Sequence, residues 1–185
     1  MKTISTYPII EADDEPKSRK FFFESTGKQS IVKAVEYSFV MEYGLGGLYN
    51  LAFGDYDRAT GAISDDKNSN NDDIWPVLNT VVNTVPTFFS EHPFATITVQ
   101  GSDSGAEFEE QCKAICANKR CAGGCRNVDR RIKAYRFFVD RNYEELKQTY
   151  VFSGYISALQ RVVPYQRNVK YDAIFVSKKQ PITFA

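Results

Sequence analysis

The chain has 185 residues and carries 23 basic and 23 acidic side chains, so its formal net charge is zero. This balance excludes a surface-wide attraction to nucleic acid or to anionic membranes, and we expect neither as a direct ligand. With 43% apolar and 14% aromatic residues the chain can bury a full core, and its length favours a single domain over residues 1–185. No apolar run is long enough for a signal sequence or a membrane span, so we expect a cytoplasmic protein.

The first part of the chain predicts an antiparallel sheet. Residues 20–57 are rich in aromatic and β-branched side chains and are interrupted by turn signals at 26–28 and 44–47, a pattern typical of three strands. Apolar and polar residues largely alternate between Ile31 and Met41. One face of this strand should therefore be core and the other solvent.

Residues 72–93 predict an amphipathic helix, because their apolar side chains recur at spacings of three and four. Asp72 or Asp73 can cap this helix, and Pro76 fits its first turn. Pro86 should kink the helix or mark its last turns.

The second part of the chain predicts a strand at 94–101, a second amphipathic helix and two closing strands at 149–156 and 169–178. The helix is indicated by an apolar stripe of Val128, Ile132, Tyr135, Val139, Tyr143 and Leu146. This order predicts an α+β fold, with a mostly antiparallel sheet, two main helices packed on one face, and a short Cys-rich inserted segment.

All four cysteines lie close together, as Cys112, Cys116, Cys121 and Cys125. Four thiolates can bind zinc, although the three-residue spacing within each pair departs from the usual two. If a helix from about Ala106 is followed by a reversal of the chain, Cys112 could instead meet Cys125, and Cys116 could meet Cys121, as two disulfides. A reducing cytoplasm favours a third alternative, buried thiols.

A candidate anion site combines Gly101, Ser102 and Ser104, at the end of a strand, with Arg131 and Lys133 on the following helix. Backbone amides and hydroxyls beside a helix start can bind a phosphate or a carboxylate, and the two cations would supply charge. Helix capping and a solvated basic face explain the same residues.

A calcium loop is a weaker interpretation of residues 55–66, where Asp55, Asp57 and Asp66 take the positions of ligands. Thr60 replaces the glycine that should make the sharp turn, and glycine follows one position later. We therefore expect a turn or a hairpin closing at Thr60 and Gly61.

Aromatic residues fall on both faces of the first strands, beginning with the run Phe21, Phe22 and Phe23. One face must be core. The other could stack on bases or dock a partner protein, but coverage by helices and by a second copy of the chain is the simpler expectation.

Several stretches together resemble a family of short uncharacterised bacterial proteins that carries only a domain-of-unknown-function label. The stretches are LYNLAFGDYD, GAISDDKNSNND, TVQGS, RRIKAYR and KYDAIFVSKK, and the resemblance covers most of residues 20–178. It implies that residues from about 105 to 127 are an insertion of this member. It also implies a neighbouring gene for a small helix-turn-helix protein, as in a toxin–antitoxin pair.

Two functions follow as hypotheses. The first is a non-enzymatic or toxin-like interaction component of a two-gene module, with the aromatic sheet or a helix face as its interface. The second is an anion- or nucleotide-binding protein or a hydrolase that uses the region of Gly101, Ser102 and Arg131, with Asp55 or Asp57 as a candidate base. The sequence has no Ser/His/Asp set and no cofactor motif, and it leaves enzymatic activity and catalytic residues undecided.

Overall fold

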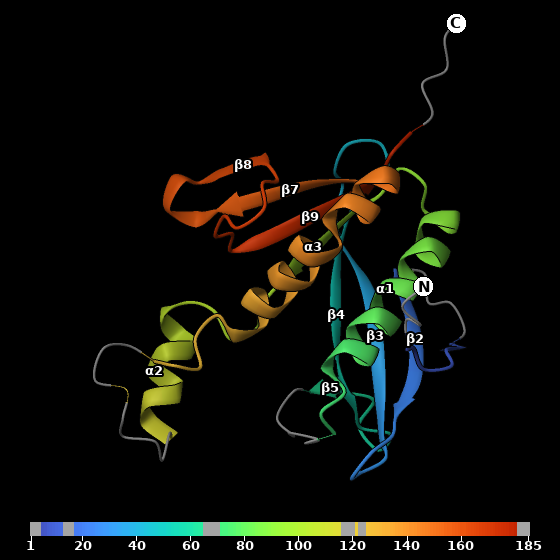
Figure 1. Cartoon of the computed structure of the whole chain (residues 1–185), viewed down its shortest axis with the longest axis vertical. Helices are drawn as coiled ribbons and strands as arrows, with labels where there is room; N and C mark the ends of the chain where they lie inside the picture. The colour runs from blue at the N-terminus through green and yellow to red at the C-terminus, as the bar shows by residue number, and fades with distance from the viewer. Residues whose placement is uncertain (1–4, 13–16, 65–70, 116–120, 122–124, 181–185) are drawn as a thin grey trace, which may run out of the picture. The chain divides into compact units, whose positions relative to one another are not determined.

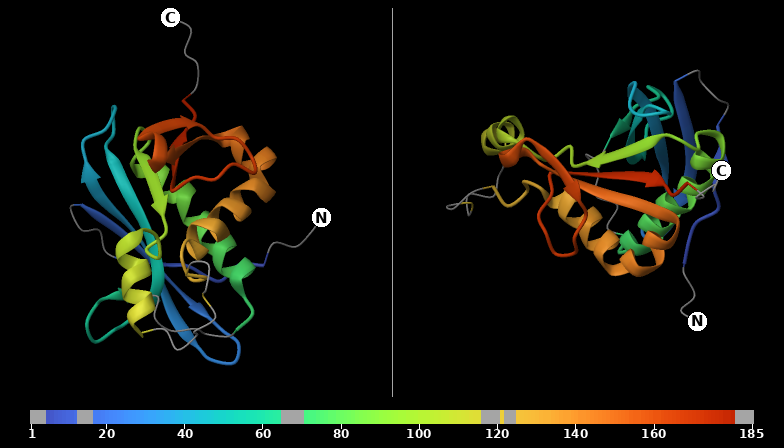
Figure 2. Two further views of the ribbon diagram at one scale, coloured as in Figure 1. Left: turned by 90° about the vertical axis from the view of Figure 1, so that its left-hand side faces the viewer. Right: turned by 90° about the horizontal axis from the view of Figure 1, so that it is seen from above.

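The computed structural model describes residues 5–12, 17–64, 71–115, 121 and 125–180. Its internal contacts divide the chain into two compact units, Met1–Ile97 and Thr98–Ala185, called unit 1 and unit 2 below. Each unit is described by itself, and the single domain over residues 1–185 stays a prediction. The elements are β1 (Ile10–Glu11), β2 (Ser18–Ser25), β3 (Ile31–Met41), β4 (Leu48–Tyr56), β5 (Ile63–Ser64), α1 (Ile74–Glu91), β6 (Thr96–Gln100), α2 (Ala106–Ile115), α3 (Arg130–Thr149), β7 (Tyr150–Ile156), a short 3-10 helix (Ser157–Leu159), β8 (Arg161–Pro164) and β9 (Ala173–Lys178), as drawn in Figures 1 and 2.

Unit 1 is an antiparallel sheet with one long helix. Strands β1, β2, β3 and β4 pair in this order, and β5 pairs with β4. Phe21 lies opposite Val35, and Tyr37 lies opposite Leu51, so these residues share one face of the sheet. The three antiparallel strands expected over residues 20–57 are confirmed.

Helix α1 covers this face and closes the core of unit 1. The Tyr37 ring stacks on the Phe88 ring of α1 with centroids 4.3 Å apart. The Tyr37 and Thr84 hydroxyl oxygens are 2.7 Å apart, and both residues are almost fully buried. A polar pair at this depth avoids the cost of an unsatisfied hydroxyl.

The expectations for the proline and for the cap of α1 have different outcomes. Pro86 lies in the last turns of the helix, as expected, because α1 ends five residues later at Glu91. Asp73 occupies the N-cap position, but its carboxylate makes no capping hydrogen bond, because it bonds Tyr7 and Ser25 instead.

Unit 2 contains three strands that pair in the order β8, β7, β9, all antiparallel. Its long helix α3 packs against β7 and β9. Gly154 of β7 lies under the Tyr171 ring, where an added Cβ would be 2.1 Å from the nearest ring atom. The strand expected at 149–156 and the helix expected after the cysteines are confirmed. The strand expected at 169–178 is confirmed from Ala173, where β9 begins.

The α+β class and the antiparallel strand pairing are confirmed within each unit. The packing of both main helices on one face stays a prediction. Of the helices that the structure describes, none is long and apolar enough to cross a membrane.

Candidate functional site

Unit 1 carries a groove of about 660 Å³, a volume within the range of ligand sites. Aromatic rings form much of its wall. The Phe22 and Tyr56 rings are in contact, with centroids 4.7 Å apart, and the Tyr7 ring stacks on Phe23 at 5.8 Å. The lining residues are Tyr7, Pro8, Ile10, Phe22, Phe23, Glu24, Thr26, Val32, Tyr56 and Arg58.

The groove follows the outer edge of β2. Successive side chains of a strand point to opposite faces, so Phe23 faces the core and Phe22 faces the other side of the sheet. Phe23 is 2% exposed, whereas Phe22 is half-buried. Because both residues line the groove, it reaches around the strand edge from one face to the other.

Strand β1 pairs with this edge at two residues, Ile10 and Glu11. Ile10 pairs with Phe22 and Ala12 N–H bonds the Lys20 carbonyl, so the outward-facing backbone groups of β2 belong to alternate residues. The next outward-facing residue is Glu24, and continued pairing would place Pro8 opposite it. Proline has no N–H to donate, and the pairing ends there.

Tyr7 is held in the groove wall by a polar cluster at the start of α1. Its hydroxyl donates to the Asp73 carboxylate at 2.7 Å, and its backbone N–H donates to the Thr80 hydroxyl at 2.9 Å. Ser25 donates to the same Asp73 oxygen at 2.6 Å. Partial burial raises the pKa of Tyr7, and the hydrogen bond to Asp73 raises it further. The hydroxyl therefore remains a donor.

The rim of the groove carries a cation. Arg58 is exposed, and it has no hydrogen bond or ion pair with any residue that the structure describes. Glu24, also on the lining, accepts a hydrogen bond from the Ser30 hydroxyl. The groove is thus mostly apolar with a free guanidinium at its border.

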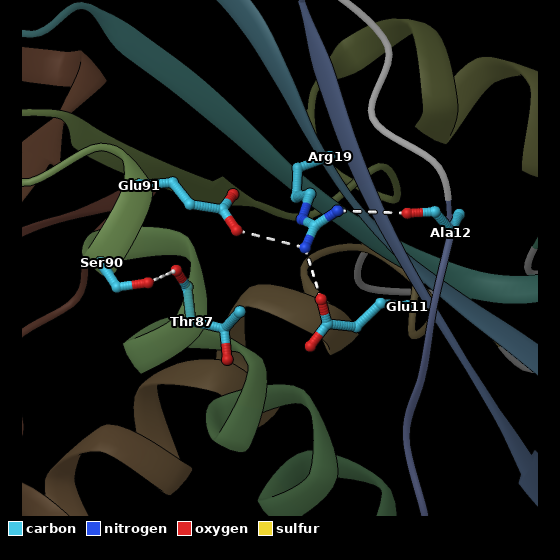
Figure 3. A network of polar contacts seen from close by, with 6 residues as sticks. All are labelled: Glu11, Ala12, Arg19, Thr87, Ser90 and Glu91. Atoms are coloured by element: carbon cyan, nitrogen blue, oxygen red, sulfur yellow. Dashed lines mark hydrogen bonds and ion pairs between the residues drawn. The ribbon is translucent and has the colours of Figure 1, made fainter.

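A buried arginine fixes the N-terminal segment beside the groove (Figure 3). Arg19 of β2 is 8% exposed, and its guanidinium binds the carboxylates of Glu11 at 2.5 Å and Glu91 at 3.2 Å. It also donates to the Ala12 carbonyl at 3.1 Å. This contact links β1, β2 and the end of α1, and sequence reasoning did not single it out.

The two carboxylates proposed as bases are both engaged. Asp55 lies opposite Lys33 on the neighbouring strand, and its carboxylate binds the Lys33 ammonium at 2.5 Å with 9% and 12% of the two side chains exposed. Asp57 accepts the backbone N–H groups of Ala59 and Thr60 at 2.8 and 3.2 Å.

The hairpin expected near Gly61 is confirmed. β4 and β5 pair on either side of this turn, and Gly61 has a positive φ of 72° that favours glycine. Asp57 bonds within the turn, as in an Asx turn. Asp66, the third residue of the calcium interpretation, lies outside the described residues.

The candidate anion residues lie together in unit 2, but they bind one another. The Arg131 guanidinium donates to the Ser102 hydroxyl. The Lys133 ammonium donates to the Val128 carbonyl at 3.1 Å. The buried Asp103 carboxylate accepts the backbone N–H of Arg131 at 3.1 Å, so the protein supplies its own anion to the start of α3.

Gly101 and Ser104 complete this arrangement. A Cβ at Gly101 would be 2.7 Å from the Asp103 carboxylate and 3.1 Å from the Ser104 hydroxyl, so a larger residue would displace the Asp103 side chain. The Ser104 hydroxyl is buried and has no hydrogen-bond partner among the described residues. The strand end and the helix start therefore meet as expected, while Asp103 takes the place expected for a ligand.

The structure places three of the four cysteines. Cys112 of α2 and Cys125 have their sulfurs 3.3 Å apart, and Cys121 is half-buried. Cys116 lies outside the described residues. Within the described part of the chain, no three metal-ligating side chains gather, and a zinc site stays a prediction.

Comparison with known proteins gives a family without an assigned activity. Neither the curated proteins nor the solved structures contain a match to this chain. One family pattern matches residues 4–106, which span unit 1, β6 and the first residue of α2, and therefore include the whole groove. The chain thus belongs to the family described as "Family of unknown function (DUF6934)".

Proposed function

We propose that the protein is a non-enzymatic interaction component of the cytoplasm that holds an extended segment of a partner protein in the unit 1 groove. The observation that carries this proposal is the groove itself, in which aromatic walls line the edge of β2 beyond the short strand β1. A surface of this kind offers both backbone hydrogen bonds and apolar contacts. Those are the two requirements for adding a strand from another chain to a sheet.

The strand edge gives the segment its direction and register. The outward-facing N–H and C=O groups of Glu24 would pair with the backbone of the bound segment, continuing the pairing that stops at Ile10. Successive side chains of the segment would then face opposite sides of the sheet. One would contact the Phe22 and Tyr56 rings, and the next would lie beside Tyr7 and Phe23.

The rim sets the charge of the preferred segment. Arg58 has no partner among the described residues, and an aspartate or glutamate beside an apolar residue would give it one. An exposed ion pair contributes little affinity, but it contributes specificity and a faster association rate. We therefore propose a partner segment that is apolar and acidic.

The partner of this proposal is the small helix-turn-helix protein expected from the resemblance, which makes the chain half of a toxin–antitoxin-like module. A second copy of the chain is the competing occupant. Direct contact with nucleic acid or a membrane is not part of the proposal, since the chain has no net charge.

Two exposed residues allow a test that spares the core. Ile10 is 68% exposed on the groove wall, and Arg58 is exposed on its rim. Ile10→Asp places a charge on the apolar wall, and Arg58→Glu reverses the charge of the rim. Leu159→Asp is the matched control, because Leu159 is 60% exposed in unit 2 and lies outside the groove.

The assay is titration calorimetry with the small helix-turn-helix protein that the resemblance leads us to expect beside this chain. We expect Ile10→Asp to weaken binding by about tenfold or more, which corresponds to about 1.4 kcal/mol, and Leu159→Asp to leave it unchanged. An absence of binding by the unmodified chain, equal binding by all three variants, or a groove-dependent homodimer in sedimentation would each overturn the proposal.

The alternative is an anion- or nucleotide-binding protein or hydrolase that uses Gly101, Ser102 and Arg131. The Ser104 hydroxyl, which has no partner in the described part of the chain, favours it, since a ligand oxygen could accept this hydrogen bond. A bound anion would have to displace the Asp103 carboxylate from the Arg131 N–H or lie beside it. In either position the two negative charges would repel each other. If phosphate or a nucleotide binds, Arg131→Ala should weaken that binding, and a lack of effect would exclude this site.

A further inference from the structure

Two cysteines of unit 2 are placed for chemistry that the groove does not use. Cys112 lies in the last part of α2, and Cys125 opens the turn that leads into α3. Their sulfurs are 3.3 Å apart, which is close contact between two thiols and longer than the bond of about 2.05 Å in a disulfide. A small movement would therefore join them.

We propose that Cys112 and Cys125 are a redox modification site, a dithiol that reacts with low-molecular-weight disulfides such as oxidised glutathione and closes to an intramolecular disulfide. The pairing is one of those that the spacing of the four cysteines allows. The structure brings these two sulfurs together.

Hydrogen bonds hold both cysteines in position for this reaction. The Cys125 backbone N–H donates to the Glu109 carboxylate of α2 at 3.3 Å, which ties the turn to the helix independently of the sulfurs. The Asn127 amide donates to the Cys112 sulfur at 3.4 Å. A site that is already ordered loses little conformational freedom when the bond forms.

Exposure makes Cys125 the first nucleophile. Cys112 is 9% exposed, whereas Cys125 is half-buried and reachable from solvent. A low-molecular-weight disulfide must reach the attacking sulfur, so the more accessible cysteine reacts first.

The reaction balances in two exchanges. The Cys125 thiolate attacks one sulfur of oxidised glutathione, forms a mixed disulfide and releases one glutathione thiolate. Cys112 then loses its proton and attacks the Cys125 sulfur, which forms the Cys112–Cys125 bond and releases the second glutathione. The protein dithiol is oxidised by two electrons, and one glutathione disulfide is reduced to two thiols.

The product would link two segments of unit 2. The turn after Cys125 is held by the Asp129 backbone N–H, which donates to the Asp103 carbonyl at 2.9 Å, and Asp103 in turn binds the start of α3 through the Arg131 N–H. A disulfide at Cys125 would fix α2 to this turn. Oxidation would thus protect the start of α3 from opening.

The test uses the full chain, equilibrated with reduced and oxidised glutathione at increasing oxidised fraction. Free thiols are then blocked by alkylation, and the protein is digested without reduction for mass spectrometry. We expect a peptide pair joined through Cys112 and Cys125, together with alkylated Cys121. Cys121→Ala is the matched control, and this variant should form the same bond at the same glutathione ratio.

A second variant separates the chemistry from folding. Cys112→Ala should retain the circular dichroism of the unmodified chain and should accumulate glutathione on Cys125, because the second exchange is blocked. The proposal is overturned if the linked peptides contain Cys116 or Cys121 instead. It is also overturned if all thiols stay free at the most oxidising ratio, or if native mass spectrometry finds zinc that leaves on thiol oxidation.

Discussion

The buried pair of Lys33 and Asp55 allows a quantitative test of the unit 1 core. Lys33→Met keeps the aliphatic stem but removes the ammonium, leaving a carboxylate that is 9% exposed without its ion pair. The second oxygen of Asp55 already has no hydrogen-bond partner in the part of the chain that the structure describes. Removing one member of a buried ion pair costs about 3–5 kcal/mol. We expect about 3 kcal/mol, because the Lys33 side chain is 12% exposed and the site retains some access to water.

The double variant Lys33→Met/Asp55→Leu distinguishes an unpaired charge from lost packing. Replacing both charges by apolar groups is often neutral, so the double variant should lie within about 1 kcal/mol of the unmodified chain. The single tryptophan, Trp75 of α1, lies in unit 1 and reports its unfolding by fluorescence in urea.

The matched control is the pair of Lys20 and Glu36 on the neighbouring strands. These groups are 3.6 Å apart, with 24% and 25% of their side chains exposed. Lys20→Met should therefore cost under about 1 kcal/mol. The reasoning fails if Lys33→Met costs no more than Lys20→Met, or if the two changes at Lys33 and Asp55 destabilise additively.

Three further predictions concern unit 2. Burial raises the pKa of Tyr165, and the hydrogen bond to Asp140 raises it further, so the protonated hydroxyl stabilises the fold. This contribution to the free energy of unfolding should be fully present below about pH 10 and should be lost at higher pH. Tyr165→Phe should reduce the loss of stability above that pH in urea titrations. Gly154→Ala would place a methyl group against the buried Tyr171 ring and should destabilise by about 1–3 kcal/mol, measured as a lower urea midpoint; an unchanged midpoint would contradict this contact. Oxidation of Cys112 and Cys125 should stabilise by about 3 kcal/mol, the value for a loop of this length, and dithiothreitol should reverse the gain.

Periodic patterns in the sequence predicted the long elements but not the short ones. The alternation in β3 and the apolar stripe of α3 each repeat several times along the element, and the structure contains both elements. β1 and β5 have two residues each, too few for any pattern. β8 was missed because its residues are mostly exposed, so no apolar face marks it. Strand pairing, which no local pattern encodes, defines all three.

The candidate sites show the same limit at the level of side chains. Gly101, Ser102 and Arg131 were expected to meet, because a strand end and a helix start bring them together. The sequence could not show that the intervening Asp103 turns its carboxylate toward the helix start, since this depends on a buried side-chain orientation. The groove was missed for a related reason: Tyr7, Phe22 and Tyr56 come from three separate segments.

The run of three phenylalanines in β2 explains why an aromatic surface remains available for a partner. Phe21 and Phe23 are 1% and 2% exposed in the core, whereas Phe22 contacts Tyr56 on the opposite side of the sheet. A strand can place only alternate residues in one core, so Phe22 is left without the cover of α1. Pro8 then stops the short strand β1 from extending along this edge. Two features, a third aromatic residue in β2 and a proline just before β1, thus contribute to the groove that we assign to a partner.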